Sequence, residues 1–214
     1  MNPDLLWWPV LMAKAFAAGL AVAAPMGPVG VLCLRRALTQ GWAAGLLTGL
    51  GAASADACFG LAVALGMSWL TDWLLAVGPR LRGLTGLCLL GLGAVLLLAP
   101  AREGRGPEPA RRWLRDYSSA FILSLGNPLV ILALTALFSA LGLAADLGRG
   151  APAALAAGAG VLLGSLAWFV LLCAFAMRFR PGLDARRLRR VNQVTGLVLG
   201  ALGLVMLLGY DLAL

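Results

Sequence analysis

The sequence predicts an all-α integral membrane protein with six transmembrane helices. Three observations support this fold class: 61% of the residues are hydrophobic and 12% are charged, the apolar residues form six long runs, and short polar segments separate the runs. A soluble domain is about half apolar and about a quarter charged, so the apolar surface of this chain suits a lipid bilayer. We expect a single transmembrane domain over residues 1–214. The start, "MNPDLLWWPV", has no basic region of a secretory signal, so no cleaved signal peptide is expected.

Each apolar run is close to or above the length of about 17–25 residues that crosses a bilayer as a helix. The longest polar segment, "AREGRGPEPARRWLRD" (101–116), indicates a solvated cytoplasmic connector, because it mixes charges with Gly and Pro. It divides the chain into halves of three spans each, 1–100 and 117–214, which must have opposite orientations. We therefore expect an inverted 3+3 repeat. The expected spans are 7–34, 41–70, 83–100, 117–145, 151–177 and 191–210.

Positive charges are distributed unevenly between the two sides of the predicted bundle. The net charge is +8, and thirteen arginines lie in the first, third and fifth loops against three in the second and fourth. Because loops rich in Lys and Arg stay in the cytoplasm, we expect the basic loops inside and both termini outside, in a bacterial inner membrane. Contact with anionic lipid accounts for the basic excess. Few aromatic residues accompany it, so no nucleic-acid partner is expected.

Lys14 is the remaining cation, and it lies inside the first predicted span. A lysine side chain can keep its stem in apolar surroundings while its ammonium group reaches the membrane interface, and this is the expected role. The alternative is that Lys14 acts as a gate or as a counter-ion on the outward path.

The first span of each half contains a predicted helix break. In the first half the break is "PMGP", Pro25 to Pro28, and in the second half it is "GNP", Gly126 to Pro128. Proline removes a backbone donor and clashes with the preceding turn of a helix. Paired breaks in corresponding spans of inverted halves indicate a transporter binding site. The alternative is a pair of ordinary proline kinks, which membrane helices tolerate.

One acidic residue, Asp56, lies inside the second predicted span. It is about 22 Å from the start of that span, near the middle of the bilayer. At about 100° per residue it shares a helix face with small residues, which let another backbone approach closely. An acid at this depth favours a functional role; the alternative is a structural acid that binds backbone groups freed by the break. The glycines expected to serve helix packing are Gly41, Gly45, Gly49 and Gly60.

The breaks and Asp56 together predict a binding site for a zwitterion. A helix that restarts at Pro28 presents N–H groups near Gly27, Val29 and Gly30, and this positive helix end suits a carboxylate. Asp56 suits an ammonium group or a proton, and the Asn127 amide offers a donor and an acceptor. An amino acid is the expected substrate. The predicted substrate-binding or coupling residues are Asp56, Pro25, Gly27, Pro28, Gly30, Asn127 and Pro128.

Three segments carry a resemblance to a known family: "PMGPVG" in the first span, "GLLTGLGAASAD" in the second and "FILSLGNP" opening the fourth. They resemble the LysE/RhtB amino-acid exporter family, also called LysE-type translocators, over essentially the whole chain. The resemblance implies proton-driven export of amino acids or related metabolites across the bacterial inner membrane, with Asp56 matching the family's acid. The family typically reads PGP where this chain inserts Met26, and often NPK where this chain has Leu129. The second difference removes a cation near the site.

Other classes of function fit these residues poorly. Histidine is absent and the spans hold one acid, so we expect no enzyme of the Ser-His or paired-aspartate type. The sequence has no GxxxxGK[ST] motif, and no cofactor is expected. The four cysteines are expected to be small apolar side chains. A divalent-cation exporter is an alternative, although one Asp without His makes a poor metal site. A membrane interaction protein without transport is another, and a homo-oligomer stays open.

Overall fold

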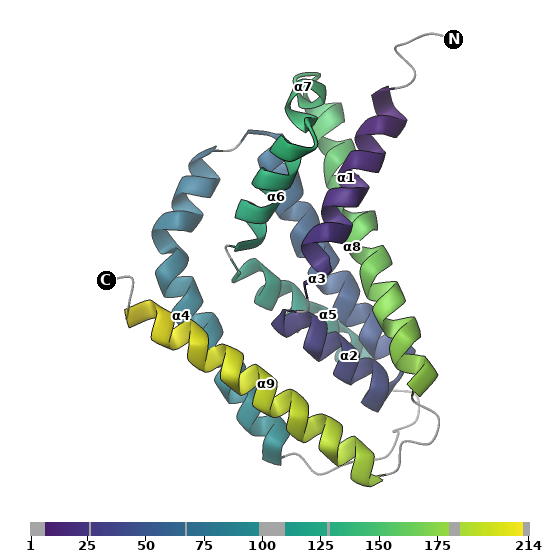
Figure 1. The fold of residues 1–214 in the computed structure, drawn as a ribbon, viewed down its shortest axis with the longest axis vertical. Helices are drawn as coiled ribbons and strands as arrows, with labels where there is room; N and C mark the ends of the chain where they lie inside the picture. The colour runs from purple at the N-terminus through teal and green to yellow at the C-terminus, as the bar shows by residue number, and fades with distance from the viewer. Residues whose placement is uncertain are drawn as a thin grey trace.

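The computed structural model describes residues 7–25, 27–66, 68–98, 110–127, 129–179 and 185–211. Within these residues the regular structure is helical, as the sequence predicted (Figure 1). The helices are α1 (Trp7–Ala23), α2 (Pro28–Gln40), α3 (Trp42–Ala64), α4 (Ser68–Leu98), α5 (Ala110–Leu125), α6 (Leu129–Ala140), α7 (Leu143–Leu147), α8 (Ala151–Phe179) and α9 (Ala185–Asp211).

Three helices are individually long and apolar enough to cross a bilayer: α3, α8 and the part of α9 from Arg186 to Leu208. Two pairs reach that length together, α1 with α2 and α5 with α6, and they bend by 82° and 70° at their breaks. The predicted span 83–100 corresponds to the shorter apolar helix Gly83–Leu98 within α4. The described residues therefore contain three spans, or five if each bent pair is one, and the six-helix repeat stays a prediction.

The predicted polar segment between the second and third spans, 71–82, is not a loop. Helix α4 continues through it from Ser68 to Leu98. Leu74, Leu75 and Ala76 favour a helix, and α4 continues through Gly78 and Pro79, which disfavour one. Helix α5 likewise begins at Ala110, inside the predicted connector 101–116.

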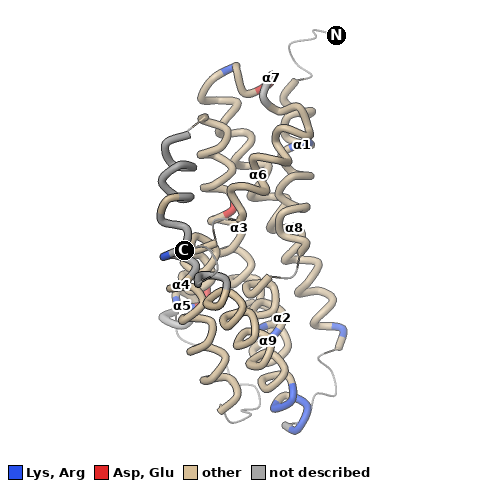
Figure 2. The backbone as a smooth tube through the Cα atoms, turned by 60° about the vertical axis from the view of Figure 1, so that its left-hand side comes forward, with Lys and Arg blue, Asp and Glu red and all other residues tan. Residues whose placement is uncertain are grey.

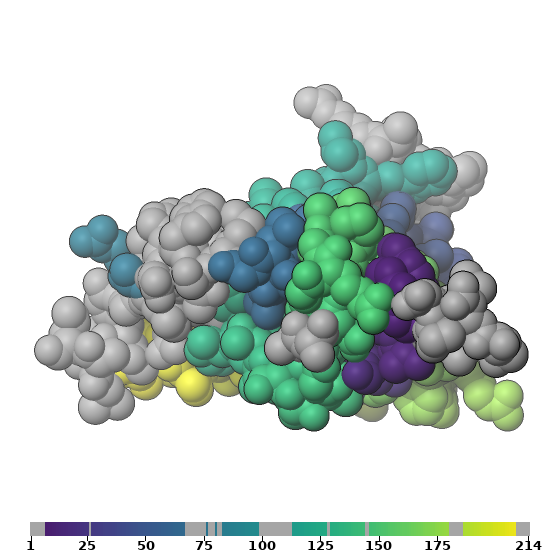
Figure 3. Space-filling view, turned by 90° about the horizontal axis from the view of Figure 1, so that it is seen from above, coloured from purple at the N-terminus to yellow at the C-terminus, as the bar shows by residue number. Residues whose placement is uncertain are grey.

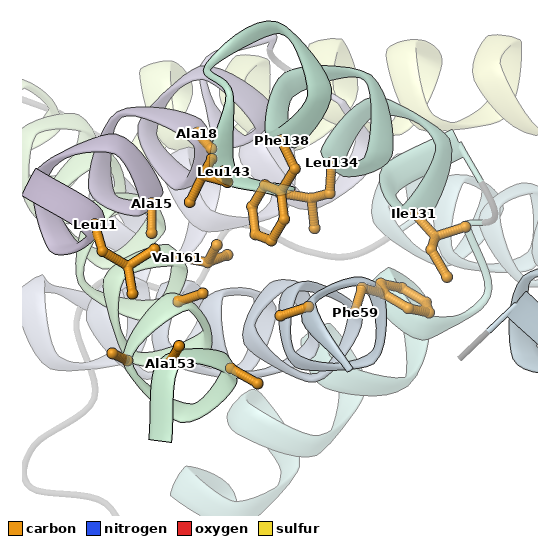
Figure 4. Packing of buried hydrophobic residues seen from close by; sticks show 14 residues of the cluster. Leu11, Ala15, Ala18, Phe59, Ile131, Leu134, Phe138, Leu143, Ala153 and Val161 are labelled. Atoms are coloured by element: carbon orange, nitrogen blue, oxygen red, sulfur yellow. The ribbon is translucent and has the colours of Figure 1, made fainter. Parts of the chain in front are cut away.

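The main hydrophobic core lies between α1, α3, α6 and α8 (Figure 4). Phe59 of α3, Phe138 of α6 and Val161 of α8 point into it and are buried. Glycines bring the backbones of α1 and α8 into contact, because a Cβ atom at Gly19 would clash with the Val161 carbonyl and one at Gly164 would clash with the backbone of α1. Small residues at such contacts drive helix association in membranes.

Helices α4 and α9 form a second unit that crosses beside the first four-helix core (Figure 1). Their backbones also meet at glycines: a Cβ atom at Gly86 would lie 2.9 Å from the Gly203 carbonyl, and one at Gly93 would lie 2.7 Å from the Gly196 carbonyl. They pack mainly on each other, and α9 also contacts α2. Glycines thus allow close backbone contact in two helix pairs, α1 with α8 and α4 with α9.

Charged residues gather at one end of the molecule. Figure 2 shows Lys and Arg where α8 ends and α9 begins, whereas the middle of the helices is mostly uncharged. We call this the arginine-rich end and define it by four exposed arginines, Arg178, Arg186, Arg189 and Arg190. Helix α7 lies at the opposite end, which we call the α7 end (Figure 1).

Candidate functional site

The first helix break uses backbone groups almost entirely. Helix α1 ends at Ala23, and α2 begins at Pro28 with Gly27 in extended conformation at its N-cap. The Gly27 N–H donates to the Pro25 carbonyl at 2.7 Å, so the prediction that this N–H points freely into the break is wrong. Val29 and Gly30 occupy the first turn of α2, where an α-helix leaves its N–H groups without intrahelical acceptors. They are the backbone donors that this break can offer to a ligand.

The second break is held by side chains. The Asn127 Oδ1 atom accepts a hydrogen bond from the Leu129 N–H at 3.2 Å and so caps the start of α6. The Thr85 hydroxyl of α4 donates to the Gly126 carbonyl at 3.2 Å. Because the cap uses the oxygen of the Asn127 amide, the NH₂ group is the part that can donate elsewhere. Pro128 and Met26 lie outside the described residues.

Asp56 faces the interior, as its helix face predicted. It lies on α3 and is 6% exposed. Ser165 of α8 lies beside its carboxyl group, and the Ser165 hydroxyl donates to the Gly19 carbonyl of α1 at 3.0 Å. Asp56 therefore lies next to the glycine contact between α1 and α8.

A cavity of about 80 Å³ lies between the two breaks and Asp56. Asp56 is the ionisable side chain among the described residues that border it. The volume is well below the about 300–1,000 Å³ of typical small-molecule sites, so the cavity is narrow in this conformation and suits a small solute. Of the predicted site residues, those that border it are Pro25, Gly27, Pro28, Gly30, Asp56 and Asn127.

Several residues that border the cavity were not predicted as site residues. Ser124 comes directly before "GNP", and Thr85 is a polar residue in an apolar run, so both had a sequence signal. Phe169 and Met206 lie in the spans of α8 and α9, and nothing in their sequence context distinguishes them from core residues. They reach the cavity because of how α8 and α9 pack against the rest of the molecule.

Asp56 and the first break lie close together although the first predicted span is not a straight helix. Helix α2 extends to Gln40, but the pair α1 and α2 bends by 82°, so the depth of the break cannot be obtained by counting residues along one axis. Asp56 and the break border one cavity because α2 turns back against α3.

Three of the four predicted packing glycines lie at close helix contacts. A Cβ atom at Gly45 would lie 2.8 Å from the Cys173 sulfur, one at Gly60 would lie 2.9 Å from Val161, and one at Gly49 would clash with Phe169. Gly41 differs, because it is the residue between α2 and α3 and has a φ of 108°. A residue with a side chain rarely adopts that backbone conformation.

Two ion pairs lie away from the cavity. Lys14 pairs with Asp146 of α7, with its Nζ atom 3.1 Å from the carboxylate, so its ammonium group has a protein partner in addition to any interface it reaches. Arg36 of α2, counted above among the loop arginines, is buried with Asp116 of α5, and their side chains approach to 3.4 Å. Sequence reasoning missed this second pair because both residues lie at the margins of predicted spans.

A larger hollow of about 720 Å³ lies between α3, α4 and α5. Leucine and isoleucine side chains such as Leu84, Leu89 and Ile122 make most of its wall. A zwitterion needs convergent polar groups to replace its water, and this wall supplies few. The smaller cavity beside Asp56 is therefore the candidate site.

The groups around the small cavity are complementary to an α-amino acid. The first turn of α2 offers N–H donors and the positive end of a helix dipole, which stabilise a carboxylate. Asp56 offers a carboxylate for an ammonium group, and Asn127 offers an amide donor. Among the described residues no group of three or more His, Cys, Asp or Glu side chains gathers as a metal site would require.

Comparison with known proteins places the chain among transporters. The family model described as LysE type translocator matches residues 20–209, a range that contains both breaks and Asp56. A protein of Bacillus subtilis (strain 168) described as "Putative amino acid efflux protein YcgF" is 26% identical over 186 residues, which is 86% of this chain and 89% of that protein. No solved structure gives a significant match.

Proposed function

Because the chain belongs to the LysE type translocator family, it is a multi-pass membrane transporter, and we propose that it exports amino acids through the cavity beside Asp56. The observation that carries this proposal is the convergence of one buried carboxyl group and both helix breaks on one cavity. The name of the Bacillus relative, an amino acid efflux protein, supports the same substrate class.

In the proposed binding mode the amino acid spans the cavity between α2 and α3. Its carboxylate accepts hydrogen bonds from the Val29 and Gly30 N–H groups at the start of α2. Its ammonium group pairs with Asp56, and the Asn127 NH₂ group donates to a remaining carboxylate oxygen. These contacts recognise the part common to all amino acids, and the side chain extends toward the apolar wall near Phe169.

We further propose that Asp56 couples export to proton entry. An ionised carboxylate buried without a cation is costly, and either a proton or a substrate ammonium group removes the cost. The hydrogen bond that Ser165 donates to the Gly19 carbonyl leaves its oxygen free to accept a hydrogen bond from protonated Asp56. An ionised Asp56 can only accept. The Ser165 hydroxyl would then have to turn toward Asp56 and leave the Gly19 carbonyl. Ionisation of Asp56 would therefore break a hydrogen bond between α8 and α1.

The proposed location is a bacterial inner membrane, with the arginine-rich end in the cytoplasm and both termini outside. The support is the charge asymmetry, since Arg178 and the arginines at the start of α9 lie at the end opposite α7. Cysteines placed at Ala151, near α7, and at Arg189 should react with a membrane-impermeant maleimide from opposite sides. Labelling of Ala151→Cys from the cytoplasmic side would show that the orientation is opposite to the proposed one.

The experiment that tests the function compares the growth medium of bacterial cells that express the protein with that of cells carrying an empty vector. We expect one or more amino acids to accumulate in the medium of expressing cells. Asp56→Asn should reduce this export by about tenfold or more, because a hydrogen-bonded charge contact contributes about 1.5–3 kcal/mol.

Ser54→Ala is the matched control on the same helix. The Ser54 hydroxyl binds the Leu50 carbonyl within α3, and the residue is not among those that border the cavity. Its export should equal that of the wild type. Equal export by Asp56→Asn would remove Asp56 from the mechanism. No amino acid enriched by the wild type, together with resistance to a toxic divalent cation, would favour the cation-exporter alternative.

A further inference from the structure

Two ion pairs join the first part of the chain, α1 to α4, to the second part, α5 to α9. Lys14 of α1 contacts Asp146 of α7 at 3.1 Å. Arg36 of α2 contacts Asp116 of α5, with its Nε atom 3.4 Å from the carboxylate. Neither pair borders the cavity beside Asp56, so neither is explained by substrate binding.

The two pairs lie on opposite sides of the first break. Lys14 is nine residues before the end of α1, which places it about 14 Å from the break along the helix. Arg36 is eight residues after the start of α2, about 12 Å beyond the break. Helix α7 lies at one end of the molecule, and α2 and α5 lie toward the arginine-rich end (Figure 1). The cavity is thus flanked by one ion pair toward each end.

The placement of the four residues follows one rule. Each pair joins a residue before the break of one half to a residue after the break of the other half. Lys14 precedes the first break and its partner Asp146 follows the second. Asp116 precedes the second break and its partner Arg36 follows the first. Such an exchange is what two inverted halves around a central site would produce.

The two ion pairs differ in burial and in hydrogen bonding. The side chains of Arg36 and Asp116 are 9% and 2% exposed, whereas those of Lys14 and Asp146 are 31% and 21% exposed. Arg36 also donates to the Thr48 hydroxyl at 2.8 Å, to the Asp116 carbonyl at 2.9 Å and to the Ser119 hydroxyl at 3.0 Å. The pair at the arginine-rich end is therefore the more deeply buried of the two, and its arginine makes more hydrogen bonds.

The α7 end has a second contact of the same kind. The Arg149 guanidinium lies over the Trp7 ring, 4.8 Å from its centre. Arg149 follows α7 and Trp7 begins α1, so this contact joins the same two segments as Lys14 and Asp146. Viewed from above in Figure 3, the green segment around α7 lies beside purple α1. Both contacts hold α7 against α1 across this end of the molecule.

We propose that the two ion pairs are gates that open in alternation, Lys14–Asp146 toward the α7 end and Arg36–Asp116 toward the arginine-rich end. The proposal rests on the proposed transport function. Both pairs are formed in this structure, and the cavity between them is narrow, with a volume of about 80 Å³. Breaking one pair frees one end, and the other pair keeps the opposite end shut.

The test measures access to the cavity from each side of the membrane. The four native cysteines are replaced by alanine, and Ser124→Cys places one thiol at the cavity wall. A membrane-impermeant maleimide is added to right-side-out and to inverted vesicles, and the rate of labelling is measured without substrate. Ala151→Cys in a separate variant identifies the side that the α7 end faces.

Asp146→Asn should raise labelling from the α7 side on the order of fivefold, the shift expected from losing a partly exposed ion pair, and leave the opposite rate equal or lower. Asp116→Asn should raise labelling from the arginine-rich side by a larger factor. If Asp116→Asn does not fold, Ser119→Ala takes its place, because it removes one hydrogen bond of Arg36 and keeps both charges. It should give a smaller rise in labelling from that same side. The double charge reversal Lys14→Asp with Asp146→Lys should restore the low rate at the α7 side.

Equal changes from both sides, or a rise from the same side in Asp146→Asn and Asp116→Asn, would overturn the gates and leave the pairs as structural ties. Because labelling needs no substrate, this outcome is separable from the proposed function. Export of amino acids with no side-specific labelling would reject only the gates, and side-specific labelling with no amino acid export would reject only the substrate.

Discussion

The two helix breaks border the same cavity but are built from different chemistry. At the first break, Pro28 starts α2 without an N–H to leave unpaired, and Gly27 binds the Pro25 carbonyl through its own backbone. At the second break, the Asn127 side chain caps α6 and the Thr85 hydroxyl braces the Gly126 carbonyl. The first break therefore offers backbone donors, and the second offers one side-chain amide.

The two breaks show two ways in which a membrane helix can be interrupted. Every backbone group freed in hydrocarbon needs a partner, and the second break finds its partners in neighbouring side chains. The first break satisfies fewer groups from the protein. Donors at the start of α2 are then left for a ligand. We infer that substrate contact depends more on the first break and the position of α6 more on the second.

The largest effect is expected from removing both prolines of the first break, Pro25→Ala with Pro28→Ala. Without them the backbone can pair with itself across the break, which withdraws the Val29 and Gly30 donors from the cavity. Export should fall more than about tenfold, the effect of losing hydrogen bonds to a charged group, while the thermal unfolding temperature in detergent stays equal or rises. Unchanged export would mean that the break is only a tolerated kink.

A smaller effect separates the two roles of Asn127. Asn127→Asp keeps an oxygen that can cap α6 but loses the amide donor and adds a negative charge to the cavity. It should retain the unfolding temperature and lose export. Asn127→Ala should lose export and also about 1 kcal/mol of stability with the cap. Thermal unfolding and export measured on both variants separate the capping role of Asn127 from its proposed contact with the substrate. Export by Asn127→Asp at the wild-type level would mean that Asn127 does not contact the substrate.

The smallest effect is expected at Thr85. Thr85→Val keeps the shape of the side chain and removes its hydrogen bond to the Gly126 carbonyl, which should cost about 0.5–1.5 kcal/mol of stability and change export little. Thr85→Ser keeps the hydroxyl and is the control. A loss of export by Thr85→Val as large as that of the proline variant would show that the two breaks contribute equally to substrate contact.

The positions of the breaks and the burial of Asp56 could be predicted because they follow from local chemistry. Proline and glycine interrupt the helix at both breaks, although Gly78 and Pro79 do not interrupt α4. The face of Asp56 follows from residue spacing along one helix. The 82° bend between α1 and α2 could not be predicted. Breakers mark where a helix stops, whereas the new direction depends on what α2 packs against.

The ion pairs and the full length of α4 were hidden for a related reason. Arg36 and Asp116 are eighty positions apart, and each lies next to other charges at the margin of a span, where a solvated role is the simplest interpretation. Arg80, with Gly78 and Pro79 before it, similarly made the segment 71–82 resemble a loop, although α4 continues through all three residues. Charge near a span end indicates topology on average, and only packing reveals which charges are buried.

In the proposed transport cycle, Asp56 exchanges a proton for the ammonium group of the substrate. The most direct measurement adds the amino acid identified by the export experiment to purified protein in weakly buffered detergent with a pH indicator. The wild type should release protons on substrate addition, and Asp56→Asn should release none while Ser54→Ala behaves as the wild type. Equal proton release by the wild type and Asp56→Asn, or substrate binding by the wild type without any release, would contradict this exchange.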